Sequence, residues 1–306
     1  MKIHHELTRD RALPPLVVAI GFFDGFHLGH LEIVRELRKL RKPGYRTGVL
    51  TFANHPATYL RPGTEPPLIT TPEERIDLFA GAGIEECFFI HFDEGIASMS
   101  PAAFVNDVLV KGLGARAVVV GKNFRFGKGR AGDAKLAHEA LAVHDIPFLG
   151  IENTAADGER ISSTRIRALI LAGRLQEAEA LLGHAFMLRG RVVLGAGRGH
   201  DLGFPTANID LAGEKILPKD GVYAAIARHD GRDHAALVSI GTNPTFDGTK
   251  RTIEAWLRDF NGTIYGEELA LREFRFVRDQ VRYENVDALL AQMEKDLTAI
   301  AYPSYG

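Results

Sequence analysis

The chain has 306 residues, of which 45% are hydrophobic and 25% charged, and its formal net charge at pH 7 is −2. The length favours two domains or one large one, and the near-neutral charge gives no support for a nucleic-acid or membrane surface. The single cysteine excludes an internal disulfide and a cysteine-rich zinc site. Without an apolar signal core or a run long enough to span a membrane, we expect a cytoplasmic protein.

The first half of the chain alternates between strand-like and helix-like segments. Apolar runs predict strands at 16–22, 47–52, 86–91, 117–120 and 146–151. Helical patterns predict helices at 31–40 and 134–143, after a Thr71-Pro72 cap with Glu74, and after Ser100-Pro101. Strands separated by helices indicate a parallel sheet with helices on both faces.

The second half changes to strands after two short helices predicted at 164–171 and 175–182. Asp230-Gly231 and Asn261-Gly262 are hairpin signals, the first between 222–227 and 235–240, the second between 252–257 and 268–277. Residues 286–300 have a helical pattern. We therefore expect an α/β plus all-β chain: residues 1–184 with the parallel sheet, and residues 185–306 as an antiparallel β-barrel with a terminal helix.

A strand-to-helix turn at residues 20–30, with the sequence IGFFDGFHLGH, is the first candidate site. His27 and His30 lie where a helix is expected to begin, and a helix N-terminus attracts phosphate through its unpaired N–H groups. The plain alternative is surface or capping histidines beside an Asp24-Gly25 turn. The chain has no P-loop and no Gly-x-Ser-x-Gly elbow, and the GAGRGH segment at 195–200 lacks the last glycine of a dinucleotide fingerprint.

Three further clusters carry polar groups suited to phosphate chemistry. The hydroxyls of Ser162, Ser163 and Thr164 precede Arg167, which fits either a second phosphate-binding helix start or ordinary capping. Thr206 and Asn208, two residues apart, either offer neutral oxygens to Mg²⁺ or are polar side chains of a strand edge without a specific role. Glu254 lies in an alternating strand and either faces solvent or, in the same pocket as Thr206, accepts a proton.

These clusters, in this order, resemble the prokaryotic bifunctional riboflavin kinase/FMN adenylyltransferase family, also called FAD synthetases, over essentially the whole chain. Residues 21–30, 51–56, 121–127 and 162–167 are similar to motifs of the adenylyltransferase half. Residues 202–208, 221–224 and 240–246 are similar to motifs of the kinase half. The resemblance implies a Rossmann-like nucleotidyltransferase domain at residues 1–184 and a riboflavin kinase barrel at residues 185–306.

The resemblance also implies two reactions with ATP, riboflavin and FMN as small-molecule partners and Mg²⁺ as cofactor. In the barrel, riboflavin would be phosphorylated to FMN, with Glu254 as base and Thr206 and Asn208 as metal ligands. In the N-terminal domain, FMN would be adenylylated to FAD, with His27 and His30 as catalytic residues. The implied nucleotide contacts are Gly21, Phe23, Asp24, Gly25, Asn123, Ser162, Ser163, Thr164, Arg167, Gly197, Gly203, Thr206 and Asn208. The implied flavin contacts are His55 and Arg278.

Several positions depart from the commonest family pattern, namely Asn123, His200, Asn243, Trp256 and Gln280. They leave open the alternative that only one activity is retained, for instance adenylyl transfer with an impaired kinase half. A second alternative is a non-catalytic flavin- or RNA-binding regulator. The barrel start has arginines but no aromatic-plus-basic stripe, so we expect no nucleic-acid partner. The sequence leaves open the oligomeric state, a homo-oligomer included, the domain arrangement and whether FMN is released between the steps.

Overall fold

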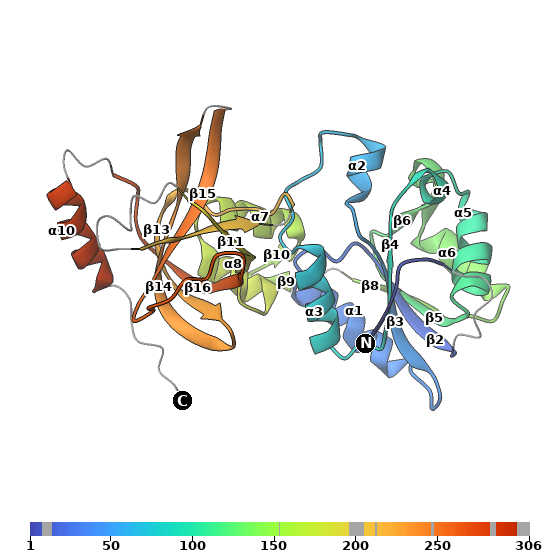
Figure 1. The fold of residues 1–306 in the computed structure, drawn as a ribbon. Coiled ribbons are helices and arrows are strands. Elements are labelled where there is room, and N and C mark those ends of the chain that lie inside the picture. Colours follow the sequence, from blue (N-terminus) through green and yellow to red (C-terminus); the bar gives the residue numbers. More distant parts are fainter. Residues whose placement is uncertain are drawn as a thin grey trace. The chain divides into compact units, whose positions relative to one another are not determined.

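The computed structural model describes residues 1–7, 14–152, 154–195, 205–211, 213–245, 248–281 and 286–298. The chain divides into two compact units, Met1–Ser163 and Thr164–Gly306 (Figure 1). The helices α7 (Ser163–Leu171) and α8 (Leu175–Leu182) fall largely in the second unit, and the Gln176 amide donates a 3.1 Å hydrogen bond to the Phe274 carbonyl of the barrel. The functional boundary expected between residues 184 and 185 stays a prediction.

The first unit is built on a six-stranded sheet in which every neighbouring pair is parallel. Its order is β1 (Lys2–His4), β4 (Glu86–Ile90), β3 (Arg46–Phe52), β2 (Leu16–Ile20), β5 (Ala115–Gly121) and β8 (Phe148–Ile151). The apolar runs predict these strands because a parallel sheet buries both faces. The edge strand β1 is an addition, since three residues give too short a pattern to identify.

Helices cover both faces of this sheet, as predicted. The helices α1 (Leu28–Lys39) and α3 (Pro72–Gly81) pack on one face with Val17 and Ala19. On the other face lie α6 (Ala134–Ala142) and a π-helical segment, η1 (Phe104–Gly112), that continues α5 (Pro101–Ala103) (Figure 1). The capping box at Thr71 and Glu74 is confirmed.

Short elements complete the first unit, and the predicted site residue His55 is the N-cap of one of them. The short helices are α2 (Pro56–Leu60), α4 (Glu94–Ala97) and the 3-10 turn η2 (Lys128–Arg130). The short strands pair as β6 (Arg125–Phe126) with β7 (Gly132–Asp133), and as β9 (Ala155–Ala156) with β10 (Glu159–Arg160).

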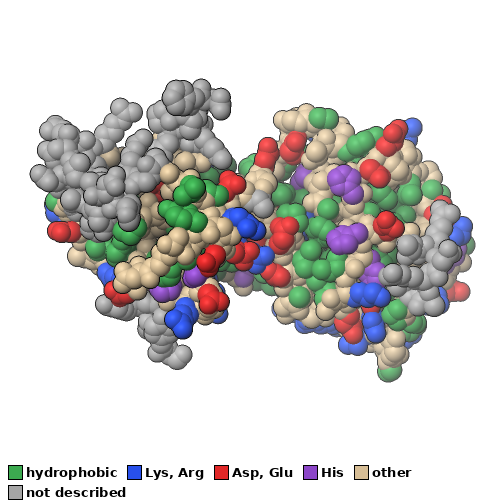
Figure 2. All heavy atoms as spheres, in the orientation of Figure 1, with side chains coloured by type: hydrophobic (Ala, Val, Ile, Leu, Met, Phe, Trp, Pro, Cys, Tyr) green, Lys and Arg blue, Asp and Glu red, His purple; other side chains and the backbone are tan. Residues whose placement is uncertain are grey.

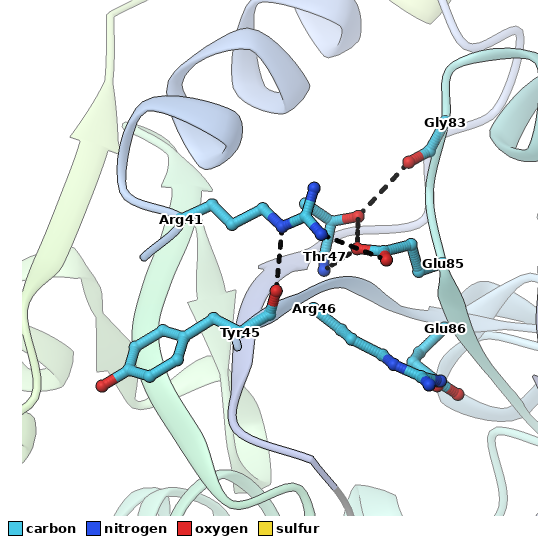
Figure 3. A network of polar contacts seen from close by, with 7 residues as sticks. All are labelled: Arg41, Tyr45, Arg46, Thr47, Gly83, Glu85 and Glu86. Atoms are coloured by element: carbon cyan, nitrogen blue, oxygen red, sulfur yellow. Dashed lines mark hydrogen bonds and ion pairs between the residues drawn. The ribbon is translucent and has the colours of Figure 1, made fainter. Parts of the chain in front are cut away.

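A polar network fixes the amino ends of β3 and β4 (Figure 3). Glu85 accepts hydrogen bonds from the backbone N–H and the hydroxyl of Thr47, at 2.9 and 3.1 Å. Glu86, only 1% exposed, accepts from Arg46 at 2.6 Å and lies 2.7 Å from Nε2 of the edge-strand residue His4. Charged side chains of the protein therefore occupy the amino ends of these strands. In an open parallel sheet, a ligand site is expected at the opposite, carboxyl ends.

The second unit is a closed antiparallel barrel, which confirms the predicted fold class. Its strands follow the order β11 (Met187–Val193), β12 (Ala207–Leu211), β15 (Gly248–Leu257), β14 (Arg232–Thr245), β13 (Gly221–His229) and β16 (Glu268–Arg278). The terminal helix α10 (Val286–Leu297) packs on the outer face of the barrel wall through Leu297, against the cluster of Val222, Ala235 and Leu237. None of the described helices is long and apolar enough to cross a bilayer.

One predicted hairpin is confirmed and the other is wrong. At Asp230-Gly231, His229 pairs with Arg232 and both turn residues have positive φ, 45° and 74°, as a type I′ turn requires. At Asn261-Gly262 the flanking strands do not pair: β15 lies between β12 and β14, and β16 between β13 and β11. The connection at 258–267 is long enough to cross two intervening strands of the barrel. A local turn signal within it therefore does not make the two flanking strands neighbours.

Candidate active sites

The turn between β2 and α1 has the strand–turn–helix geometry that the sequence predicts. His27 is the N-cap of α1, with φ −70° and ψ 173°. Within the turn, Phe23, Gly25 and Phe26 have positive φ angles of 56°, 78° and 36°. Two non-glycine residues in this region are an energetic cost that persists where the surroundings impose the conformation, and such strain clusters at functional sites.

His27 and His30 form a stacked pair at the start of α1. Their ring centroids are 3.6 Å apart with an interplanar angle of 14°, and Phe23 packs edge-on against His30 at 5.2 Å. Burial, His27 and the Arg75 guanidinium hold the pKa of His30 well below its usual value. The buried Nδ1 of His30 has no hydrogen-bond partner among the described residues. A neutral imidazole still carries one N–H group, which can donate a hydrogen bond to an incoming phosphate.

Glycines make room for these rings. A Cβ at position 29 would lie 3.1 Å from Cε1 of His27, and one at position 21 would lie 3.0 Å from Cζ of Phe23. Gly29 therefore lets the His27 ring fold back over the first turn of α1. Gly21 lets the Phe23 ring lie over the end of β2.

The Asp24 carboxylate is bound to the protein backbone. It is 3% exposed and accepts from the N–H groups of Ile69 and Thr70, both at 3.0 Å, and from the Thr70 hydroxyl at 3.2 Å. The Gly25 N–H donates to the same hydroxyl at 3.0 Å. Ser163, at the start of α7, donates to the Asp24 carbonyl at 2.9 Å. Asp24 thus holds the turn in place, which is a different use of its charge from direct phosphate contact.

Two other predicted residues lie on loops of the first unit. His55 caps α2, its Nδ1 accepting from the Ala57 N–H at 3.0 Å, and its ring packs edge-on against Phe22 at 4.6 Å. Asn123 is exposed after β5 and, with its amide oxygen turned toward Arg160, accepts from that guanidinium at 2.7 and 3.1 Å. The His55 ring thus contacts Phe22 of the first turn, whereas the Asn123 amide contacts Arg160.

The remaining predicted residues of this cluster are Ser162, Thr164 and Arg167. Ser162 is partly buried in the first unit, whereas Thr164 and Arg167 belong to the second unit, on α7. Their part in holding a nucleotide stays a prediction.

In the barrel, strand register places the predicted kinase residues side by side. Asn208 of β12 pairs with Glu254 of β15, and Glu254 pairs on its other side with Ser239 of β14. Directly opposed residues of antiparallel strands project from the same face. Their neighbours Ile253 and Ala255 are buried in the barrel, so the row lies on the outer face of the wall.

Gly195 and Gln280 support the two ends of this row. A Cβ at position 195 would overlap the Asn208 amide, so the glycine allows that side chain to lie against the end of β11. The Gln280 amide donates to the Ser239 hydroxyl at 3.1 Å. Thr206 is partly buried immediately before β12. Gly197, Gly203 and His200 lie outside the described residues, as does the Asn243 side chain.

Arg278 is anchored to the terminal helix. Its Nη2 and Nε lie 2.7 and 2.9 Å from Oδ2 of Asp296, a buried residue of α10. The same carboxylate accepts from the Gln292 amide at 2.8 Å. A flavin contact by Arg278 stays a prediction, and the structure adds that this guanidinium holds α10 to β16.

The donor chemistry beside Glu254 suits Mg²⁺. Asn208 and Thr206 supply neutral oxygens, and Glu254 supplies a carboxylate from the paired strand. Magnesium binds few protein ligands and shares its shell with substrate phosphates and water. Within the described part of the chain there is no group of three or more His, Cys, Asp or Glu residues that could form a metal site of their own.

Two residues that sequence reasoning missed are Arg75 and Ser239. Arg75 lies on α3 under the first turn, and Ser239 adjoins Glu254 through strand register alone. From the sequence, an arginine in an amphipathic helix is predicted to face solvent, and a serine in a strand is predicted to have no specific role. Only the register of β14 and β15 would have identified the second.

Comparison with known proteins gives a consistent result for both halves. The family model described as FAD synthetase matches residues 10–165, and the one described as riboflavin kinase matches residues 182–302. Bifunctional riboflavin kinase/FMN adenylyltransferases from Listeria monocytogenes and Bacillus subtilis are 36% and 32% identical, covering 96% of this chain and 94% and 93% of their own. A crystal structure described as a macrolide-efflux protein from Streptococcus pneumoniae is 31% identical with a TM-score of 0.85, covering 98% of this chain and 99% of that one.

Proposed function

Because this chain belongs to the bifunctional riboflavin kinase/FMN adenylyltransferase family, we propose which of its residues carry each of the two reactions. The chain phosphorylates riboflavin to FMN with ATP, and adenylylates FMN to FAD with release of pyrophosphate. We propose no efflux function, although the description of the pneumococcal structure names one, because both family models and the named relatives agree on flavin chemistry. We assign the kinase to residues 185–306 and adenylyl transfer to residues 1–184.

For the kinase step, the row Asn208–Glu254–Ser239 carries the proposal. The 5′-hydroxyl of riboflavin attacks the γ-phosphorus of ATP, the bond from that phosphorus to the bridging oxygen breaks, and ADP leaves. Glu254 accepts the hydroxyl proton. Thr206 and Asn208 would hold a magnesium ion together with the ATP phosphates, where it neutralises charge on the transferring group. Gly197 and Gly203 are proposed nucleotide contacts, and Arg278 a flavin contact.

For adenylyl transfer, the stacked His27 and His30 at the start of α1 carry the proposal. A phosphate oxygen of FMN attacks the α-phosphorus of ATP, the bond to the bridging oxygen breaks, and pyrophosphate leaves. The two imidazoles and the N-terminus of α1 stabilise charge on the phosphates. The backbone of Gly21, Phe23 and Gly25 lines the turn, and Asp24 holds it in place. Other proposed contacts are Asn123, Ser162, Ser163, Thr164 and Arg167 for the nucleotide, and His55 for the flavin.

We further propose that the enzyme works in the cytoplasm on small molecules, without a nucleic-acid or membrane partner. On the face shown in Figure 2, described acidic and basic side chains are interspersed rather than gathered by sign, in keeping with a net charge of −2. A polyanion-binding surface would favour a basic patch.

The test is a flavin-product assay. The full chain is incubated with ATP and MgCl₂ and either riboflavin or FMN, and the flavins are separated by chromatography. We expect FMN and then FAD from riboflavin, and FAD directly from FMN. FAD from FMN, with riboflavin left unchanged, would contradict the kinase assignment and point to the departures from the family pattern at His200, Asn243, Trp256 and Gln280.

A further inference from the structure

Arg75 is a fully buried arginine on α3, with no exposed surface. Its Nη1 donates to the Phe22 carbonyl at 2.6 Å and its Nη2 to the Phe52 carbonyl at 3.0 Å. Phe22 lies just beyond the end of β2, and Phe52 is the last residue of β3. The guanidinium therefore joins the carboxyl ends of two neighbouring parallel strands, where the first turn begins.

Aromatic rings and a second donor complete this arrangement. The Arg75 Cζ lies 4.4 Å from the ring centroid of Phe22 and 5.2 Å from that of Phe89. The Thr51 hydroxyl donates to the same Phe22 carbonyl at 3.1 Å. The backbone of Phe22 is thus held by two side chains immediately before Phe23, which adopts the first positive φ of the turn. This fixes the direction in which the chain leaves β2.

The charge of Arg75 has no bonded carboxylate. Among the described residues no Asp or Glu forms an ion pair with Arg75, and its buried Nε has no hydrogen-bond partner. Burial lowers the pKa of Arg75 to about 10, against the opposing effects of Asp24, Cys87 and Glu73, so it is cationic at neutral pH. A buried cation without a bonded carboxylate is costly, and a methionine would fill the same space. Packing alone does not account for an arginine here.

We propose that Arg75 is a positioning residue for adenylyl transfer: it fixes the turn that presents His27 and His30, and places a constant positive charge behind them. The inference rests on the proposed assignment of that reaction to this turn. Arg75 reaches the substrate only through the residues it holds, so its loss should alter the geometry and the charge state of the imidazoles together.

The charge should be visible in the titration of His30. The groups that face His30 are His27 from the start of α1 and Arg75 from α3, and Asp24 in the turn acts on Arg75. Both His27 and Arg75 favour the neutral form of His30. Removing the Arg75 charge should therefore raise the pKa of His30, whereas an amine in its place should leave the value nearly unchanged.

The experiment compares three variants in the full chain. Arg75→Met removes charge and both hydrogen bonds, Arg75→Lys keeps the charge, and Thr51→Val removes only the second bond to Phe22. Arg41→Met is the matched control, because Arg41 also binds a backbone carbonyl, that of Tyr45 at 2.8 Å, but at the amino ends of the strands (Figure 3). FAD formation from FMN is measured beside riboflavin phosphorylation in the same sample, and the His30 imidazole is titrated by NMR without ATP.

We expect Arg75→Met to lower kcat for FAD formation about a hundredfold and to raise the His30 pKa. Arg75→Lys and Thr51→Val should each lower kcat about tenfold without moving that pKa. Riboflavin phosphorylation should stay at the wild-type rate throughout, and Arg41→Met should match the wild type in both reactions.

Wild-type FAD formation by Arg75→Met, or an unchanged His30 pKa in that variant, would overturn the inference. Should Arg75→Met fail to fold, wild-type kcat in both folded variants, Arg75→Lys and Thr51→Val, would overturn it equally. His30→Ala separates the two levels: FAD formation by that variant at the wild-type rate refutes the proposed site itself. Loss in His30→Ala with none in the Arg75 and Thr51 variants refutes only the role of Arg75.

Discussion

Replacing Asp24 by asparagine removes the charge that holds the first turn to the segment at Ile69 and Thr70. The carboxylate accepts from two backbone N–H groups and one hydroxyl, and it is 3% exposed. An amide retains one acceptor oxygen and turns an NH₂ group toward the other donors. A hydrogen bond to a charged acceptor is worth about 1 kcal/mol more than a neutral one, and an orphaned buried N–H costs about 1–3 kcal/mol.

The expected loss of stability for Asp24→Asn is therefore about 2–4 kcal/mol. For a unit of this size, each kcal/mol corresponds to about 2–4 °C, so its Tm should fall by roughly 5–15 °C. Differential scanning calorimetry of the full chain measures the Tm shift. If heat inactivates FAD formation at a lower temperature while riboflavin phosphorylation is unaffected, the shift belongs to the first unit. The same change at Asp93, which caps α4 at the surface, is the control, because asparagine caps a helix equally well. Equal Tm shifts in the two variants would refute the reasoning.

Three further predictions concern other parts of the chain. Gly195→Ala should displace the Asn208 amide and lower riboflavin phosphorylation about tenfold while sparing FAD formation from FMN, which a rate comparison checks. Burial opposes ionisation of Glu86, but hydrogen bonds from His4 and Arg46 keep its pKa below 4.5. The wild-type chain should therefore have a higher Tm than Glu86→Gln at neutral pH, and this difference should shrink as the pH falls below 4.5. Cys87 is buried and its pKa is raised to about 12, so the native chain should not react with Ellman's reagent, whereas the denatured chain should titrate one thiol.

Local rules were sufficient for most of the fold. The run at Leu16–Ile20 is apolar at every position because both faces of the sheet are covered, and the capping box at Thr71 sets the start of α3 by itself. Asp230-Gly231 adopts the turn that its residue types favour. These features depend on neighbours within a few residues, which a sequence displays directly.

Features that depend on distant contacts were not predictable. The partners of Asn261-Gly262 follow from barrel closure, and β1 exists because His4 and Glu86, 82 residues apart, meet at the sheet edge. In the first site, His27 and His30 were found at the helix start as predicted. The use of the Asp24 carboxylate by backbone groups 45 and 46 residues away, and the burial of Arg75 beneath the turn, follow only from the folded chain.

The central claim is that two separate sites carry two successive reactions, and paired substitutions test it most directly. Glu254→Gln and His30→Ala are each given riboflavin or FMN with ATP and MgCl₂, and the flavins are quantified. We predict that His30→Ala converts riboflavin to FMN and stops there. We predict that Glu254→Gln converts FMN to FAD but leaves riboflavin unchanged. Equal loss of both reactions in either folded variant would contradict the account.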